Sequence, residues 1–387
     1  MKILFITPFN PLDRSAGGAV RSGVMLETLR QLGEVKTLVA SQGEVPVTGR
    51  ERENDITILP FYSVYRLPLK WTLFIVFSTF VRSLGWGFPG KRQIEKSLGV
   101  SSDDYDVIVV RYLWCAVKLG VWKLGKCIVD VDDSPVAHAN TNLLPRMSGW
   151  SRPFVRSIYV SWLYLICRQV SGLLVANSND VKTLRKVNEN VAYFPNNSPS
   201  PGADYRIRPS SRYLLSVGCM AFAPNFQGID KFLEEEWPAI RARHPELVFK
   251  VAGRLPSEEY QAKWRSVDGV EVLGFVDDLA GLYAGCLLAV VPLWAGGGTS
   301  VKTIEAVKYG CKVVATPVGA RGFDEAQRTA LRIDVARERG EFVPLLERWM
   351  AKSEEERLAA RREIQRRARE VNTRETCVAA MRSVVGG

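Results

Sequence analysis

The chain has 387 residues, of which 47% are apolar and 24% charged, a composition typical of a soluble globular protein. The length is too great for one ordinary domain and suits two domains of about 150–200 residues each. The net charge of +11 is uneven, because residues 1–200 carry +8 and residues 201–387 carry +3. The basic first half favours an anionic partner, either anionic lipid or a phosphate-bearing acceptor. No nucleic-acid-binding motif is recognisable, so we expect no nucleic-acid partner.

The cysteines and the N-terminus indicate the compartment. Seven cysteines, none in a Cys-x-x-Cys pair, argue against a zinc site or a disulfide framework and agree with a reducing cytosol. The first eleven residues have a short apolar run and no small-residue cleavage site after it. They therefore indicate a buried first strand rather than a signal peptide, and we expect a cytoplasmic protein.

The first half alternates short apolar runs with amphipathic stretches. Most runs are continuously apolar, as expected for parallel strands that helices cover on both faces. Helices are expected at Ala19–Leu32 and from Asn177 toward Lys186. The predicted strands are Lys2–Thr7, Val35–Ala40, Ile56–Leu59, Asp106–Val110, Cys127–Asp130, Leu173–Ala176 and Val191–Phe194.

A second alternating series follows a linker of turn-forming residues at 196–202. Its expected helices include Phe226–Arg243 and Thr299–Tyr309, and an arginine-rich helical tail from Glu354 is expected to present a solvated face. Its predicted strands are Tyr213–Val217, Val248–Val251, Val270–Leu273, Leu287–Val291 and Lys312–Ala315. Two such series predict the α/β class with two Rossmann-like, doubly wound domains facing across a cleft. We place them at residues 1–197 and 198–370, with a C-terminal helix at 371–387 that crosses back to the first domain.

Two glycine-containing turns join a strand to a helix. Gly17-Gly18 follows the first strand, where glycines let the backbone approach a ligand, although a structural turn explains the pair equally well. In Pro292–Ala306, three glycines follow a buried strand and Thr299 or Ser300 begins a helix. This arrangement predicts a diphosphate-sized anion site at the carboxyl end of a parallel sheet.

The C-terminal half resembles glycosyltransferase family 4 and its relatives of the GT-B fold, over roughly residues 211–324. Lys2–Thr7 and the Gly17-Gly18 turn match the opening of that family less specifically. The matching segments, in the expected order, are Ser216–Gly218, Pro224-Asn225, Val251–Arg254, Gly274–Leu279, Gly296–Ala306 and Val313–Gly319.

The resemblance implies an activity. It implies transfer of a sugar, most simply a hexose, from a UDP- or GDP-sugar to a hydroxyl of a lipid-linked or cell-surface glycan, with retention of configuration. The domain at 198–370 would bind the donor and the domain at 1–197 the acceptor. No metal or other cofactor is required if the helix dipole and Lys302 neutralise the departing phosphates.

The resemblance also implies roles for individual residues. Glu305 would hold the donor ribose, the amides of residues 299–301 would meet the distal phosphate, and the segment around Val276 would bind the nucleobase. Gly297 stands where the family has a further Glu, and Cys219 where it has an Arg, so Lys302 or Arg254 would have to compensate. The implied donor site comprises Gly17, Gly18, Gly218, Arg254, Val276, Gly297, Gly298, Thr299, Ser300, Val301, Lys302 and Glu305.

The catalytic candidates are Glu305 and two residues of the first domain. Asp130–Asp133 has the Asp-x-Asp pattern that binds a divalent ion in single-domain glycosyltransferases, but the two-domain architecture argues against a metal here. Asp133 and His138 instead follow the carboxyl end of a parallel strand. Either could orient the acceptor or take the proton from its hydroxyl.

Two other functions are alternatives to sugar transfer. A nucleotide-sugar epimerase or another Rossmann-type oxidoreductase would need a G-x-G-x-x-G turn after a strand and an acidic residue about 20 positions later, and neither is found. A two-lobed sugar-binding protein would normally be exported, and no signal peptide is recognised.

Two aromatic segments predict a peripheral position at the inner face of the membrane. Trp71–Val81 is uncharged, too short to span a bilayer, and flanked by basic residues. Trp150–Arg168 interleaves aromatic and arginine side chains, as interfacial segments do. Ordinary helices packed on the sheet are the alternative for both. The flanking residues of the first segment are Arg66, Lys70, Arg82, Lys91 and Arg92.

Overall fold

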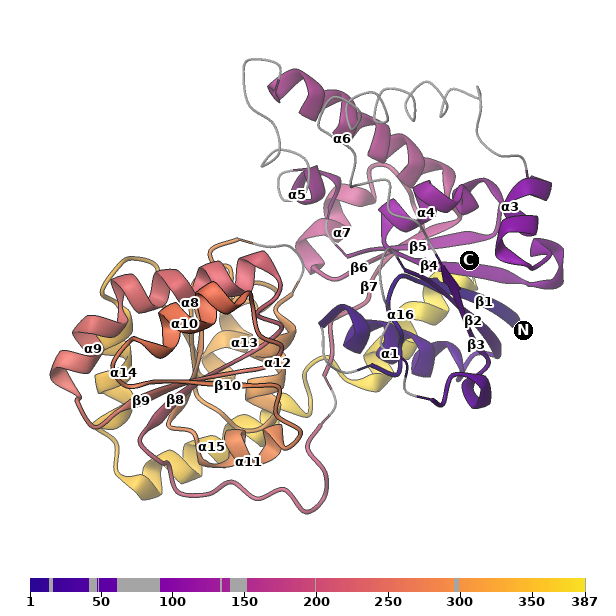
Figure 1. Ribbon diagram of the computed structural model, residues 1–387. Coiled ribbons are helices and arrows are strands. Elements are labelled where there is room, and N and C mark those ends of the chain that lie inside the picture. The colour runs from indigo at the N-terminus through magenta and orange to yellow at the C-terminus, as the bar shows by residue number, and fades with distance from the viewer. Residues whose placement is uncertain are drawn as a thin grey trace. The chain divides into compact units, whose positions relative to one another are not determined.

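The computed structural model describes residues 1–13, 17–41, 47, 49–60, 91–132, 134–139, 152–198, 200–295 and 299–386 (Figure 1). The chain forms two compact units. The first comprises residues 1–14, 18–195 and 374–387, and the second residues 15–17 and 196–373. Apart from the short segment 15–17, the chain passes between the units after Pro195 and again after Thr373.

The first unit is built on a seven-stranded parallel sheet in the order β3-β2-β1-β4-β5-β6-β7. Its central strands β1 and β4 are apolar at every buried position except the last, which is Thr7 in β1 and Arg111 in β4, and these apolar runs let helices cover both faces. Because β1 pairs with β2 on one side and β4 on the other, the strand order reverses beside β1. The strands are β1 Lys2–Thr7, β2 Glu34–Ser41, β3 Ile56–Pro60, β4 Val107–Arg111, β5 Cys127–Asp132, β6 Gly172–Val175 and β7 Val191–Tyr193.

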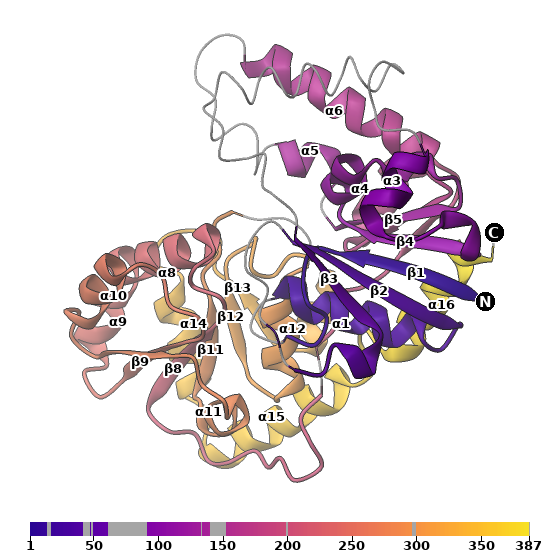
Figure 2. The same cartoon turned by 45° about the vertical axis from the view of Figure 1, so that its right-hand side comes forward.

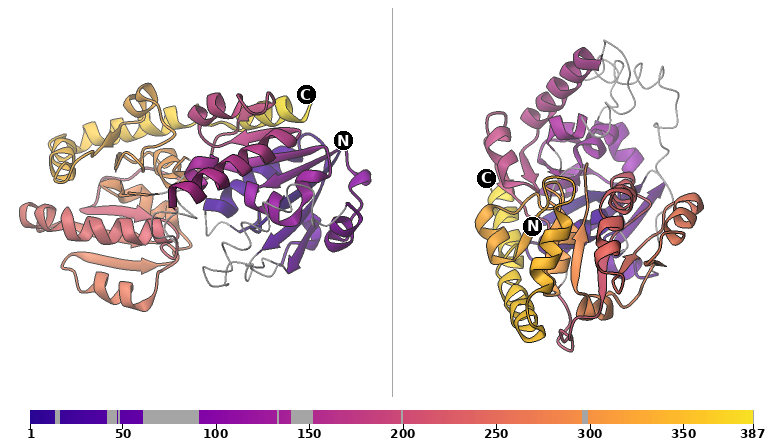
Figure 3. Two further views of the ribbon diagram at one scale, coloured as in Figure 1. Left: turned by 90° about the horizontal axis from the view of Figure 1, so that it is seen from above. Right: turned by 90° about the vertical axis from the view of Figure 1, so that its left-hand side faces the viewer.

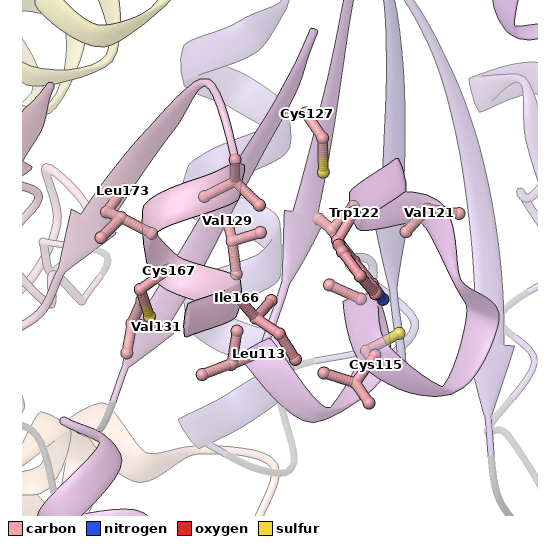
Figure 4. Packing of buried hydrophobic residues seen from close by; sticks show 14 of the residues in the cluster. Leu113, Cys115, Val121, Trp122, Cys127, Val129, Val131, Ile166, Cys167 and Leu173 are labelled. Carbon is pink, nitrogen blue, oxygen red and sulfur yellow. The ribbon is translucent and has the colours of Figure 1, made fainter. Parts of the chain in front are cut away.

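Helices cover the two faces of this sheet. Helices α4 and α6 pack against one face, where Leu113 of α4 and Ile166 of α6 join Val129 of β5 in one cluster of buried residues (Figure 4). Helices α1 and α16 pack against the other, so the end of the chain completes this core (Figure 3). The helices of this unit are α1 Gly17–Leu29, α3 Lys91–Leu98, α4 Leu113–Leu119, α5 Pro135–His138, α6 Arg152–Gln169, α7 Ser178–Leu184 and α16 Arg374–Val385.

The second unit has a six-stranded parallel sheet in the order β10-β9-β8-β11-β12-β13 (Figure 2). Helices α8, α9, α10 and α14 cover one face, and α11, α12 and α15 the other. The strands are β8 Tyr213–Val217, β9 Val248–Ala252, β10 Val270–Gly274, β11 Leu288–Val291, β12 Val313–Ala315 and β13 Ile333–Val335. The helices are α8 Ala223–Glu235, α9 Trp237–Arg243, α10 Glu258–Arg265, α11 Leu279–Gly285, α12 Val301–Lys308, α13 Glu325–Ala330, α14 Phe342–Met350 and α15 Glu354–Ala368.

The expected α/β class with two Rossmann-like sheets is confirmed. One expected helix, Phe226–Arg243, is wrong, because it is divided into α8 and α9 at the buried Glu236. Pro238 lies in the first turn of α9, where its missing N–H costs nothing, whereas inside one continuous helix it would remove a hydrogen bond.

The segment expected as a linker is anchored to the second unit. Asn196 donates from Nδ2 to the Thr299 carbonyl at 2.8 Å, and its own carbonyl accepts from Asn372 at 3.0 Å. Lys308 donates to the Ser198 carbonyl at 2.6 Å. Asn196 and Asn372 flank the two places where the chain passes between the units, so one hydrogen bond ties these crossings together.

The described residues include helix α6 but not the first of the two segments expected at the membrane. Trp71–Val81, Lys70 and Arg82 lie outside the described residues. In α6, Tyr159 and Trp162 are buried in the core, so the expectation that they face an interface is wrong. Phe154 is 68% exposed and Leu165 50%. None of the helices in the described ranges is both long and apolar enough to cross a membrane.

Candidate functional site

Three glycines bring the backbone together at the carboxyl edge of the second sheet, where β8, β9 and β10 end. Gly253 has a φ of +121°, and a Cβ there would meet the carbonyl oxygen of Gly218 at 2.0 Å. Gly253 donates its N–H to the Gly274 carbonyl at 2.7 Å. Only glycine therefore lets the chain after β9 approach the end of β8 this closely. In doubly wound sheets, ligands bind at this edge.

Lys302 extends from α12 across this edge. Its Nζ donates to Oδ1 of Asn225 at 2.6 Å, and a Cβ on Gly218 would lie only 3.2 Å from it. Asn225 is itself fixed, because its Nδ2 donates to the Cys219 carbonyl at 2.7 Å. Burial lowers the pKa of Lys302 to about 8, against the opposing effects of Cys219 and Glu305. The ammonium group is therefore held at the end of β8 by a neutral partner.

Glu305 lies one turn further along α12. The hydroxyl of Tyr283, on α11, donates to Oε2 of Glu305 at 3.0 Å. Burial raises the pKa of Glu305, and this effect is opposed by the Tyr283 hydrogen bond and by Lys302. Tyr283 is buried and stacks on Tyr309 with ring centroids 4.7 Å apart. Sequence analysis missed Tyr283, because no local pattern relates it to a residue 22 positions later.

The start of α12 has the properties of an anion site. Ser300, the residue before the helix, has a buried Oγ that makes no hydrogen bond within the described part of the chain. Thr299 is buried, and Thr303 anchors the first turn by donating to the Gly319 carbonyl at 2.7 Å. The N–H groups of Thr303 and Ile304 donate to the Ser300 carbonyl, so the N–H groups of this first turn that an anion could use are those of Val301 and Lys302.

The segment predicted to bind the nucleobase contains an exposed aromatic side chain, Phe275, next to Val276. Val276 is half-buried against the α11–α12 side of the core, whereas the neighbouring Phe275 is 65% exposed. The side chain of Arg254 is exposed. Phe275 was not among the predicted residues, although its position next to Val276 could have marked it as a further contact of the nucleobase. The expected Gly297 and Gly298 lie outside the described residues.

At the carboxyl edge of the first sheet, Asp130 pairs with two arginines. Arg21 of α1 donates to both its oxygens, at 2.5 and 2.9 Å, and Arg111 of β4 donates to Oδ2 at 2.6 Å. All three side chains are buried, and the arginines hold the pKa of Asp130 below its usual value although burial opposes them. The Asp-x-Asp pattern therefore binds guanidinium groups at its first position. Asp132 lies 3.4 Å from Arg111.

The other described residues of the first unit that were expected at the site do not belong to the cluster around Asp130. His138 ends α5 and stacks on Tyr159 with ring centroids 6.2 Å apart, and burial lowers its pKa to about 4. It is therefore neutral near pH 7. Gly18 makes room for Phe9, whose ring would lie 2.6 Å from a Cβ at that position. Gly17 is the first residue of α1. Asp133 lies outside the described residues.

Comparison with known proteins extends these observations. Residues 211–346 match the family described as glycosyl transferases group 1. No curated protein sequence matches the chain. The fold resembles three solved structures of low sequence identity, all covered over 98–100% of both chains. They are HepE of Anabaena in complex with UDP and glucose (TM-score 0.65, 11% identity), WaaG, a glycosyltransferase involved in lipopolysaccharide biosynthesis (0.64, 15%), and a UDP-forming α,α-trehalose-phosphate synthase of Burkholderia xenovorans (0.62, 13%).

Proposed function

We propose that this chain, whose residues 211–346 match the group 1 glycosyl transferases, transfers a hexose from a nucleoside-diphosphate donor, held by the second unit, to a hydroxyl of a glycan acceptor held by the first. The reaction breaks the bond between the anomeric carbon and the diphosphate oxygen. The acceptor oxygen bonds to that carbon, and its proton passes to a base. Retention of configuration and a lipid-linked or cell-surface acceptor are proposed on the family resemblance.

The observation that carries this proposal is the spacing of two groups on α12. Lys302, held by Asn225, supplies positive charge at the glycine edge, and Glu305 supplies a carboxylate one turn away. A leaving diphosphate needs the first, and a ribose hydroxyl is bound by the second. With the N–H groups at the start of α12, Lys302 provides the charge that a metal ion supplies elsewhere, and we propose that the reaction needs no metal or other cofactor.

We propose UDP rather than GDP as the nucleotide. HepE was solved with UDP, and the trehalose-phosphate synthase is UDP-forming. Thermal-shift measurements with UDP, GDP and NAD test the proposal. A ligand at 100 times its dissociation constant stabilises a protein by about 2.7 kcal/mol, and we expect that stabilisation from UDP. Stabilisation by NAD alone would instead identify an oxidoreductase.

We also propose that the first unit docks at an anionic membrane surface on the cytoplasmic side, where it would meet a lipid-linked acceptor. The charge of +8 in residues 1–200 supports this proposal. So does helix α6, on which Phe154, Leu165 and Arg168 are all exposed.

A further inference from the structure

Three aromatic side chains gather at the carboxyl edge of the first sheet. Phe9 follows β1, while Tyr112 and Trp114 follow β4, the strand next to β1. The Tyr112 ring lies 6.0 Å from Phe9, edge-on, and 5.9 Å from Trp114, stacked at 22°. All three are half-buried. They stand beside the point where the strand order reverses, which is where doubly wound sheets bind ligands.

A carboxylate lies beside these rings. Arg111 donates to the Tyr112 hydroxyl at 2.9 Å, lies over its ring at 4.3 Å, and contacts Asp132 at 3.4 Å. Asp130 is fully buried beneath them, whereas the side chain of Asp132 is 17% exposed. Asp132 is therefore the acid of this cluster that a ligand can reach.

The backbone is held in unusual conformations to place these side chains. Tyr112 has a φ of +70° and Asp132 a φ of +51°, both at the ends of neighbouring strands. Residues with a side chain rarely adopt such conformations, and those that do occur preferentially at binding and catalytic sites. The Phe9 ring takes the space that the missing side chain of Gly18 leaves.

We propose that Phe9, Tyr112, Trp114 and Asp132 form a sugar-ring binding site. The C–H face of a pyranose would lie on the exposed parts of the aromatic rings, and one of its hydroxyls would donate to Asp132. The inference rests on the proposed function, for which it supplies the acceptor subsite.

The charges of the cluster select the class of ligand. The guanidinium groups of Arg21 and Arg111 are balanced by the carboxylates of Asp130 and Asp132. Among the described residues of the cluster the two positive and two negative charges therefore balance, and an added phosphate or carboxylate would meet the negative charge of Asp132. The site therefore takes neutral hydroxyls and rejects a phosphorylated group.

Fluorine NMR of protein labelled with 5-fluorotryptophan tests this inference, with the Trp114 resonance identified from Trp114→Phe. Methyl glycosides of glucose, galactose, mannose and N-acetylglucosamine are titrated, and glycerol 1-phosphate serves as the anionic probe. We expect the Trp114 resonance to shift with at least one glycoside and not with glycerol 1-phosphate. Asp132→Asn should weaken glycoside binding at least tenfold, and Phe154→Ala, on α6, should leave it unchanged.

UDP binding, followed by calorimetry on the same samples, separates this inference from the donor proposal. A Trp114 resonance that no glycoside shifts, in protein that binds UDP, overturns the sugar site alone. Glycoside binding in protein that binds no nucleotide overturns the donor proposal alone. A response to glycerol 1-phosphate but to no glycoside also overturns the inference. If Asp132→Asn does not fold, Trp114→Leu replaces it, with glycoside binding measured by saturation-transfer NMR.

Discussion

The Tyr283 hydroxyl donates a 3.0 Å hydrogen bond to Oε2 of Glu305. This bond uses one lone pair of Oε2. A ligand can therefore donate to Oε1 and to the remaining lone pair of Oε2. The hydrogen bond also stabilises the ionised form of a carboxyl group whose pKa burial raises. Tyr283 is therefore a positioning residue for Glu305.

We expect Glu305→Ala to lower sugar transfer or donor hydrolysis a hundredfold or more while the fold remains intact. The loss of hydrogen bonds between a carboxylate and the ribose hydroxyls costs about 2–4 kcal/mol. Steady-state kinetics and circular dichroism measure the two effects. Glu258→Ala, on the exposed start of α10, is the matched control. A folded Glu305→Ala protein with unchanged kinetics would defeat the assignment.

Tyr283→Phe removes one hydroxyl and keeps the stacking on Tyr309. We expect KM for the donor to rise about fivefold, because one such hydrogen bond contributes about 1 kcal/mol. Glu305 must be ionised to accept from the ribose. Since the Tyr283 hydrogen bond lowers its pKa, the variant should lose activity at a higher pH on the acidic side of the profile. An acidic limb at the same pH as in the wild type would contradict this role.

Lys302 makes nucleotide binding depend on pH. Its pKa is about 8, so it is charged below that value and neutral above it, and affinity for UDP should fall as the pH rises through about 8. Calorimetry with UDP and with uridine measures this dependence. We expect Lys302→Met to weaken UDP binding at least tenfold, to flatten its pH dependence, and to leave uridine binding unchanged. Arg254→Ala is the comparison, and if it alone produced these effects, Arg254 would be the phosphate-binding cation.

His138 is the candidate base in the first unit. Its pKa of about 4 leaves it neutral at physiological pH and able to take a proton, so protonation of His138 should not limit activity until the pH falls to about 4. Loss of a general base typically slows a reaction by about 10²–10⁴-fold. We expect a loss of this size in His138→Ala or in Asp133→Ala, measured as turnover at saturating donor. Near-native turnover in both would show that the acceptor chemistry lies elsewhere.

Membrane docking should be electrostatic in part. We expect co-sedimentation with anionic vesicles to weaken as salt rises and in a charge-reversal variant of Lys70, Arg82, Lys91 and Arg92. Replacing Phe154 and Leu165 by Ser should weaken it further, because both lie exposed on α6. Neutral vesicles are the control. No binding to anionic vesicles at low salt would rule the proposal out.

The strands could be predicted because each one is marked by the residues of its own short stretch of sequence. Residues 107–110 of β4 and Leu288–Val291 are short, continuously apolar runs, and such runs are typical of buried parallel strands. The pairing of Lys302 with Asn225 joins residues 77 positions apart, and no periodic pattern encodes it. In α6, Tyr159, Trp162 and Ile166 recur at helical spacing, which is the pattern of a core-facing stripe. The expectation of interfacial aromatics overlooked that spacing.

The placement of α16 sets an order for synthesis of the protein. Cys377, Met381 and Val384 complete the core that α1 forms against the first sheet, whereas the second unit consists almost wholly of the continuous stretch 196–373. A ribosome has therefore released the second unit before it supplies the helix that closes the first. The nascent first sheet exposes apolar surface throughout that interval, and a message truncated before codon 374 would yield a chain that never covers it.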